Sequence, residues 1–131
     1  MIVPFNPSAD LILVPVRISG SIDTRVLKFV FDTGASRTIV TPDALDELGY
    51  NARDGEVITS ISSVVGREFG YRIRVQCVEV FGGTVDDLPV FCHDIAGGDI
   101  DGLLGLDVMR HFDIEISVRK GTLTAIPAPS A

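Results

Sequence analysis

One aspartate of this chain stands in a setting that suits hydrolytic chemistry. Residues 29–36 have the sequence Phe-Val-Phe-Asp-Thr-Gly-Ala-Ser, so Asp32 comes directly after an apolar strand and directly before a tight turn. Two carboxylates about 3 Å apart cannot both ionise, and such a pair holds one proton. The ionised member can take a proton from water while the protonated member donates to a carbonyl, which is the general acid–base chemistry needed to split an amide bond. Asp32 supplies one of these two carboxylates.

The two residues after Asp32 fit this chemistry. Gly34 removes a Cβ where the backbone must turn sharply and where a substrate or a partner loop could approach. Thr33 offers a hydroxyl that could hydrogen-bond to a second loop. The tripeptide alone is weak evidence, because it occurs by chance and Asp32 could simply begin a turn. The motifs elsewhere along the chain must therefore show whether Asp32 belongs to a catalytic site or only begins a turn.

A second catalytic carboxylate is not evident in the same chain. Asp101 and Asp107 flank the run Leu103-Leu104-Gly105, but neither is followed by Thr-Gly or Ser-Gly. Asp107 falls at the start of a predicted short helix, where an acidic side chain complements the helix dipole. We interpret both residues as structural. The second carboxylate is therefore expected to be Asp32 of another copy of the chain.

The elements that must position Asp32 are predicted mostly as strands. Alternating or continuous apolar runs bounded by turn residues predict strands at 11–18, 26–31, 37–40, 56–61, 68–80, 84–92, 114–118 and 122–126. A break in alternation at Cys77-Val78 suggests a bulge or a strong twist. Thr41-Pro42-Asp43 begins a short helix that Gly49 ends, and a second short helix is expected over about 106–112. Residues 1–10 are expected to be irregular, and 127–131 a loose tail.

Composition limits the class of protein. The chain has 131 residues, 46% of them hydrophobic and 22% charged, with a net charge of -7. These values favour one folded domain and, since the basic residues are scattered, no nucleic-acid partner. No apolar run approaches the roughly 18 to 20 residues of a membrane helix, and no secretory signal is evident. We therefore expect no membrane association and a cytoplasmic location.

Neither the histidines nor the cysteines predict a metal centre. His93 and His111 share no metal-like spacing, and Cys77 and Cys92 form no Cys-x-x-Cys motif. No metal and no cofactor are expected. Free thiols are the simplest interpretation of the two cysteines, while a disulfide stays open if the chain resides in an oxidising compartment.

Taken together, the motifs resemble those of retropepsin-like, single-lobe aspartic proteases, within the superfamily of pepsin and the retroviral proteases. Residues 30–36 match the catalytic loop of that family, the apolar-tipped hairpin around 62–66 stands where the family has its flap, and 101–109 match its later motif of two hydrophobic residues and glycine. The resemblance implies an all-β, closed barrel-like fold with one or two short helices and a β-hairpin flap. It implies a single domain over 1–131, with a core at about 11–126, a short N-terminal arm and a C-terminal tail.

The resemblance also implies a function. The chain would be an aspartic endopeptidase active as a homodimer on a polypeptide substrate, with a water activated by the two copies of Asp32. The catalytic residues would be Asp32, Thr33 and Gly34, and the substrate-binding residues Ala35, Ser62, Ser63, Val64, Val65 and Gly66. Because Ala35 replaces the hydroxyl residue of pepsin-type enzymes, we expect a less acidic optimum than theirs. The alternative is a non-catalytic dimerisation or peptide-binding module with the same fold.

Overall fold

The computed structural model describes residues 1–51, 55–63, 66–96 and 99–128. For residues 56–63 and 66–69 it describes the backbone but not the side chains. The elements, in chain order, are β1 (Ile2–Pro4), β2 (Leu13–Ser19), β3 (Thr24–Phe31), β4 (Ile39–Val40), α1 (Pro42–Leu48), β5 (Glu56–Ser63), β6 (Gly66–Val80), β7 (Gly83–Cys92), β8 (Gly102–Leu104), α2 (Leu106–Met109), β9 (Phe112–Ser117) and β10 (Thr122–Pro127).

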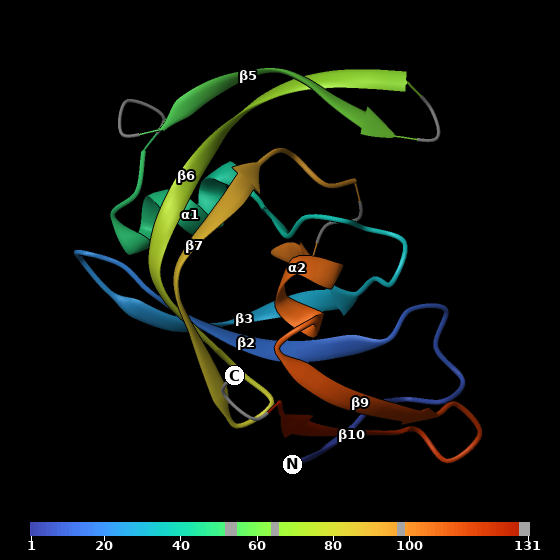
Figure 1. Ribbon diagram of the computed structural model, residues 1–131. Coiled ribbons are helices and arrows are strands. Elements are labelled where there is room, and N and C mark those ends of the chain that lie inside the picture. The colour runs from blue at the N-terminus through green and yellow to red at the C-terminus, as the bar shows by residue number, and fades with distance from the viewer. Residues whose placement is uncertain (52–54, 64–65, 97–98, 129–131) are drawn as a thin grey trace.

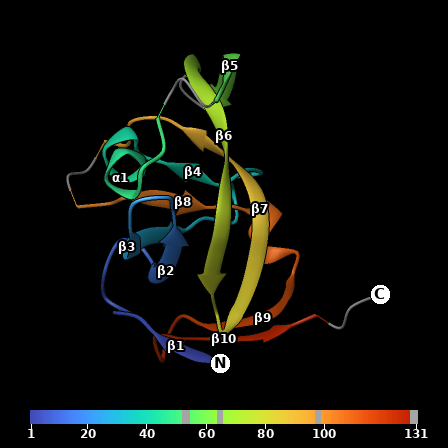
Figure 2. The same ribbon diagram turned by 90° about the vertical axis from the view of Figure 1, so that its left-hand side faces the viewer.

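The larger sheet closes on itself. Its strand order is β2-β3-β8-β4-β7-β6-β5, and an additional pairing of β2 with β6 joins the two sides of a six-stranded barrel (Figure 1). Strand β5 continues outward from β6 as the last strand of this sheet. Strands β1, β10 and β9 form a second, three-stranded sheet, which lies below the barrel (Figure 2). The expected all-β, closed barrel-like fold with two short helices is confirmed.

Alternation of apolar and polar residues explains the strands of the barrel. In β2, the side chains of Val14, Val16 and Ile18 are buried while those of Pro15 and Arg17 are exposed, as expected for a strand with one face on the core. The last three residues of β3, at 29–31, are all buried, as their continuous apolar sequence predicts.

Helix α1 begins and ends as its sequence predicts. The hydroxyl of Thr41 accepts a hydrogen bond from the N–H of Ala44, and Pro42 occupies the first helical position. Gly49 ends the helix with φ of 98°, a left-handed conformation that glycine adopts without steric cost. Ala44, Leu45 and Leu48 are its buried residues and attach the helix to the core.

Two expectations about the ends of elements are wrong. Residues 2–4 are not irregular but form β1, which pairs with β10, and the Met1 ammonium donates to the Ala125 carbonyl at 2.7 Å. Helix α2 stops at Met109 rather than near Phe112, because Phe112 already begins β9 and is buried in the core. The alternation that predicts β9 thus starts two residues earlier than expected.

The break in alternation at Cys77-Val78 is not a bulge in the pairing of β6 with β7. That pairing keeps one register from Tyr71↔Cys92 to Val80↔Gly83. Instead, β6 bends here to pair with β2, beginning at Ser19↔Cys77. The register shift that involves β6 lies instead in its pairing with β5, between Ile58 and Ile61 of β5.

A tyrosine hydroxyl joins the strands at this bend. The Tyr50 hydroxyl donates to the carbonyl of Ser19 in β2 and accepts from the N–H of Gln76 in β6. The Tyr50 side chain is buried, and this burial raises its pKa. Tyr50 thus supplies polar partners at the point where β6 changes from pairing with one strand to pairing with two.

The turn between β6 and β7 contains an aromatic residue in a left-handed conformation. Phe81 has φ of 55° and Gly82 has φ of 77°, the combination required by a two-residue type I′ hairpin. The Phe81 ring contacts Phe31 and Phe112 edge-on, with centroids 6.2 and 5.3 Å apart. Packing with these two rings offsets the backbone strain of the turn.

Both cysteines are free thiols, Cys92 buried and Cys77 half-buried, as the simpler interpretation had it. Burial raises the pKa of each thiol.

Within the described residues, no helix has the length and apolar character needed to cross a membrane.

Candidate active site

Asp32 lies where a parallel pair of strands ends. Strand β3 pairs in parallel with β8, up to Phe31↔Leu104, and the N–H of Asp32 extends this ladder by donating to the Leu104 carbonyl at 3.0 Å. The backbone of Asp32 therefore belongs to the sheet, while its half-buried side chain stands at the start of the loop 32–38. A strand end is a rigid position for a reacting group.

The turn after Asp32 is held by its own carboxylate. The N–H of Gly34 donates to Oδ1 of Asp32 at 3.0 Å, and the N–H of Ala35 donates to its carbonyl at 3.2 Å. A Cβ added at Gly34 would stand 3.3 Å from the same Oδ1, a tight contact that would press on the carboxylate. Thr33 and Gly34 are exposed and Ala35 is half-buried. The loop thus presents one carboxylate with an oriented oxygen at an open surface.

A buried polar network anchors the far end of this loop. The N–H and the hydroxyl of Thr38 donate to the two carboxylate oxygens of Asp107, at 3.0 and 2.7 Å. The Thr38 hydroxyl also accepts from the N–H of Gly105 at 3.1 Å, and Asp107 accepts from the N–H of Val108. Thr38 is only 1% exposed, so these bonds lie in a low-dielectric setting where they matter most.

The hydrogen bonds of Asp107 and Asp101 explain the structural roles of these two acidic residues. Both oxygens of Asp107 are occupied by Thr38 and by the first turn of α2, so Asp107 is a brace for the loop. Asp101 accepts from the N–H of Lys28 at 2.9 Å and holds the start of β8 against β3. The structural interpretation of both residues agrees with these bonds.

Gly105 allows the loop and α2 to approach closely. A Cβ at Gly105 would stand 2.7 Å from the carbonyl carbon of Arg37 and 2.9 Å from the Ala35 oxygen. That same Ala35 oxygen accepts from the N–H of Leu106 at 2.8 Å. The motif Leu-Leu-Gly is thereby explained: its leucines belong to β8, and its glycine lets the loop 32–38 lie directly on the turn into α2.

An apolar row crosses the sheet beside Asp32. Strand pairing aligns Leu13 of β2 with Val30 of β3, Val30 with Leu103 of β8, and Leu103 with Ile39 of β4. Val30 is buried without belonging to the main core cluster, and the other three side chains are half-buried. These residues form a partly open apolar surface next to the carboxylate, which we call the floor row.

The predicted hairpin is present. Strands β5 and β6 pair antiparallel from Glu56↔Arg72 to Ser63↔Gly66. Ser62, Ser63 and Gly66 lie at its closed end, whereas Val64 and Val65 lie outside the described residues. In Figure 1 the closed end and the loop between β3 and β4 are both at the right of the molecule, with the hairpin above the loop.

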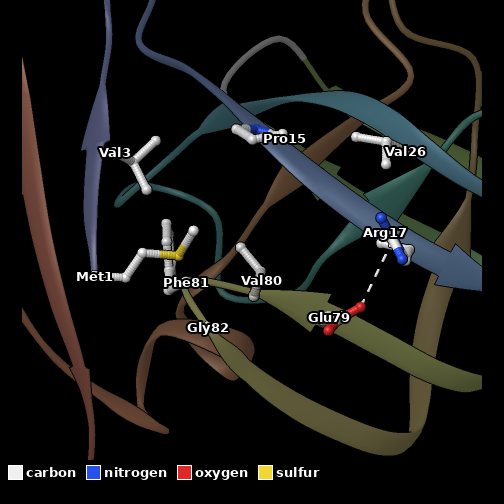
Figure 3. A pocket seen from close by; sticks show the side chains of 9 residues that line it. All are labelled: Met1, Val3, Pro15, Arg17, Val26, Glu79, Val80, Phe81 and Gly82. Atoms are coloured by element: carbon white, nitrogen blue, oxygen red, sulfur yellow. Dashed lines mark ion pairs between the residues drawn. The ribbon is translucent and has the colours of Figure 1, made fainter.

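A surface pocket of about 270 Å³ lies elsewhere on the molecule. It is lined by parts of β2, β3 and β6 together with Met1 and Val3, and the ion pair of Arg17 with Glu79, at 3.7 Å, is part of its lining (Figure 3). None of the loop residues 32–38 is among the described residues that line it. This pocket is therefore separate from the candidate site.

The described residues contain no group of three or more His, Cys, Asp and Glu side chains that could hold a metal.

Tyr71 and Cys92 interact across the β6–β7 pair. Burial, and to a smaller extent this contact with Cys92, raises the pKa of the Tyr71 hydroxyl. Neither group belongs to the loop 32–38.

Sequence reasoning missed Thr38 and the floor row. Thr38 lies within the short strand expected at 37–40, and strict alternation there would have placed Arg37 and Ile39 on one face and Thr38 on the other. The floor row could not be aligned from the sequence, because three of its four strands are brought together by parallel or long-range pairing.

Comparisons with known proteins agree with this geometry. The family model of the aspartyl proteases matches residues 14–108. A retropepsin-like aspartic protease from Rickettsia conorii superposes with a TM-score of 0.73 at 18% identity, covering 96% of this chain and 92% of that one. The EIAV protease in complex with an inhibitor gives a TM-score of 0.63 at 24% identity over 82% of this chain and 92% of that one. The retroviral protease-like domain of Ddi1 from Leishmania major gives 0.60 at 20% identity over 92% and 97%.

No curated protein sequence matches the chain significantly. The fold and the site define a single-lobe, retropepsin-like β-barrel with one Asp-Thr-Gly loop. The chain belongs to the aspartyl protease family.

Proposed function

We propose that this protein is an aspartic endopeptidase that acts as a homodimer. The observation that carries the proposal is the state of the acidic residues around the loop. Asp32 presents its carboxylate at an open surface, while Asp107, the acidic residue bonded to the same loop, has both oxygens occupied. Hydrolysis by a carboxylate pair needs a second group like Asp32, and a second copy of the chain supplies one.

In this proposal the two Asp32 side chains share one proton and titrate as a coupled pair. The ionised carboxylate takes a proton from the attacking water, and the protonated one donates to the carbonyl oxygen of the scissile peptide bond. Gly34 keeps Oδ1 of its own Asp32 oriented through the N–H bond. Thr33, exposed beside it, bonds the partner loop and holds the two loops together.

The substrate would be a polypeptide bound in extended form. The closed end of the β5–β6 hairpin, at Ser62, Ser63 and Gly66 together with Val64 and Val65, would add main-chain hydrogen bonds above it. Ala35 and the floor row would contact it from below. Because the floor row is apolar, apolar side chains are favoured next to the scissile bond.

Digestion of a diverse peptide mixture across a range of pH tests the proposal. The wild-type protein is expected to cleave internal peptide bonds, and Asp32→Ala to lose at least about 10³-fold in kcat/KM while keeping its circular dichroism spectrum. Cleavage by Asp32→Ala at the wild-type rate would exclude the mechanism. Binding of peptides without turnover at every pH would instead identify a peptide-binding module.

Mixing separates the dimer from a single-chain mechanism. If each active unit needs two intact Asp32 residues, an excess of Asp32→Asn exchanged into wild-type protein lowers activity well beyond simple dilution, because mixed dimers carry one carboxylate. Activity proportional to the amount of wild-type chain alone would contradict the shared site. Dependence of specific activity on protein concentration gives an independent check.

A further inference from the structure

Arg37 is an exposed residue of the loop 32–38, directly before the segment that leads into the floor row. Its neighbour Thr38 is directed inward, 1% exposed and bonded to Asp107, whereas Ile39 belongs to the floor row. Arg37 itself is exposed, and its backbone lies two residues before the outer end of the row at Ile39.

The backbone around Arg37 is held on both sides. The Ala35 carbonyl accepts from Leu106 at 2.8 Å, and the Thr38 carbonyl accepts from the N–H of Phe91 at 3.0 Å. The close packing of Gly105 against the Arg37 carbonyl leaves little room for this segment to shift. The guanidinium can change rotamer, but the point from which it extends is fixed relative to Asp32.

The charge of Arg37 is not compensated within the part of the chain that the structure describes. Arg17, Arg25 and Arg74 each pair with a carboxylate, at 3.7, 2.8–2.9 and 3.2 Å respectively. Arg37 has no ion pair among the described residues, although the chain carries 18 acidic side chains against 11 basic ones. In an acidic protein, a lone guanidinium beside an apolar binding surface is an available partner for a carboxylate from outside.

We propose that Arg37 is a specificity-determining residue that selects peptides carrying Asp or Glu close to an apolar cleavage site. The inference rests on the proposed endopeptidase function. The planar guanidinium matches a carboxylate with two parallel hydrogen bonds. Because a two-fold dimer brings two copies of Arg37, one on each side of the scissile bond, an acidic side chain is favoured on either side.

Matched peptides test this directly. The probes share one apolar cleavage site and differ only in carrying Glu, Gln or Lys at each position flanking its apolar pair. With wild-type protein, kcat/KM for the best Glu position is expected to exceed that of its Lys counterpart by about five- to tenfold, and added salt to reduce the ratio. Arg37→Glu should reverse the order, Arg37→Gln abolish it, and Arg37→Lys keep part of it.

Lys120→Glu is the control for net charge, because it makes the same change in the exposed β9–β10 turn and should leave the ratio unchanged. Equal cleavage of the Glu and Lys peptides by wild type, or an unchanged ratio in Arg37→Glu, would overturn the role of Arg37 and leave the endopeptidase function standing. If no peptide is cleaved, the proposed function fails. The affinities of Asp32→Asn for the same peptides then test the role of Arg37. Tighter binding of the Glu peptides than of the Lys peptides supports that role, and equal binding overturns it.

Discussion

The loop after β3 and the β5–β6 hairpin differ in the backbone pairing that the structure describes for them. The loop 32–38 is bonded to β8, to β7 and to α2, and buried Thr38 links it to Asp107. The hairpin leaves the closed barrel, with β5 as the last strand of the sheet and β6 as its one partner in the strand order. A register shift interrupts even this pairing.

The difference fits the two tasks that the proposed function assigns to these regions. Groups that react must be held within a fraction of an ångström, and the loop is held from three directions. In the proposed function the hairpin admits an extended peptide and must therefore open, and segments that open are those with few bonds to the rest of the fold. Measurements of stability and of hydrogen exchange test this contrast.

The largest effect is expected when the anchor of the loop is removed. Asp107→Ala leaves the N–H and hydroxyl of Thr38 and the N–H of Val108 without their acceptor, so the free energy of unfolding should fall by about 2–4 kcal/mol. Urea denaturation measures this fall. Asp113→Ala, which removes an exposed carboxylate from β9, is the matched control and should change stability by less than about 0.5 kcal/mol. Equal stability of the two variants would show that the loop does not depend on Asp107.

Hydrogen exchange compares the two regions in the same sample. The amides of Asp32, Thr38 and Leu106 are bonded within the barrel and should exchange near the rate of global unfolding. Amides at the closed end of the hairpin, at Ser62 and Ser63, should exchange at least about 100-fold faster. Similar protection in both regions would mean that the hairpin is as firmly held as the loop, and the contrast would fail.

The smallest effect is expected at Tyr50, which marks where the fixed part of β6 begins. Tyr50→Phe removes the bonds to Ser19 and Gln76 and should lower the free energy of unfolding by about 1–2 kcal/mol at neutral pH. It should also speed exchange in β6 next to the hairpin more than in the loop 32–38.

Tyr50 also predicts a pH dependence. Its pKa is raised by burial above the ordinary value of 10.0, so the unfolded chain loses this proton first as the pH rises. Stability from Tyr50 is therefore complete below about pH 10 and is lost as the pH rises from there through the folded pKa. Wild-type stability should fall more steeply than that of Tyr50→Phe in this range, because the variant lacks the contribution of Tyr50. The stability of the variant also falls, because the raised pKa values of Cys77, Cys92 and Tyr71 contribute in both proteins. Parallel curves would contradict the shift.

Local sequence signals were sufficient for the fold class and for the elements that have their own start and stop residues. Helix α1 shows this best, since Thr41, Pro42 and Gly49 each act at the position expected. The hairpin and the strand before Asp32 followed from alternation and from continuous apolar residues. What could not be predicted depends on partners far away in the chain, such as the pairing of residues 2–4 with β10 and the bend of β6 onto β2.

The same distinction holds for the candidate site. Asp32, Thr33 and Gly34 were identified because a tight turn after an apolar strand is a local pattern. Thr38 was not, because its importance comes from a hydrogen bond to a residue 69 positions later. The catalytic roles assigned to Asp32, Thr33 and Gly34, and the substrate-binding roles assigned to Ala35 and to the hairpin end, remain predictions.

The long separation between Thr38 and Asp107 has a consequence for the order in which this protein is made. The loop 32–38 is synthesised about 60 residues before β8 and α2, which hold it and which begin only after residue 101. Contacts of such separation form late in folding, since the intervening chain must first be ordered. A nascent or truncated chain that ends before Asp107 would therefore carry the loop 32–38 without the bonds from Thr38 that anchor its far end. We therefore expect the loop 32–38 to reach its native geometry only after residues 101–109 have been synthesised.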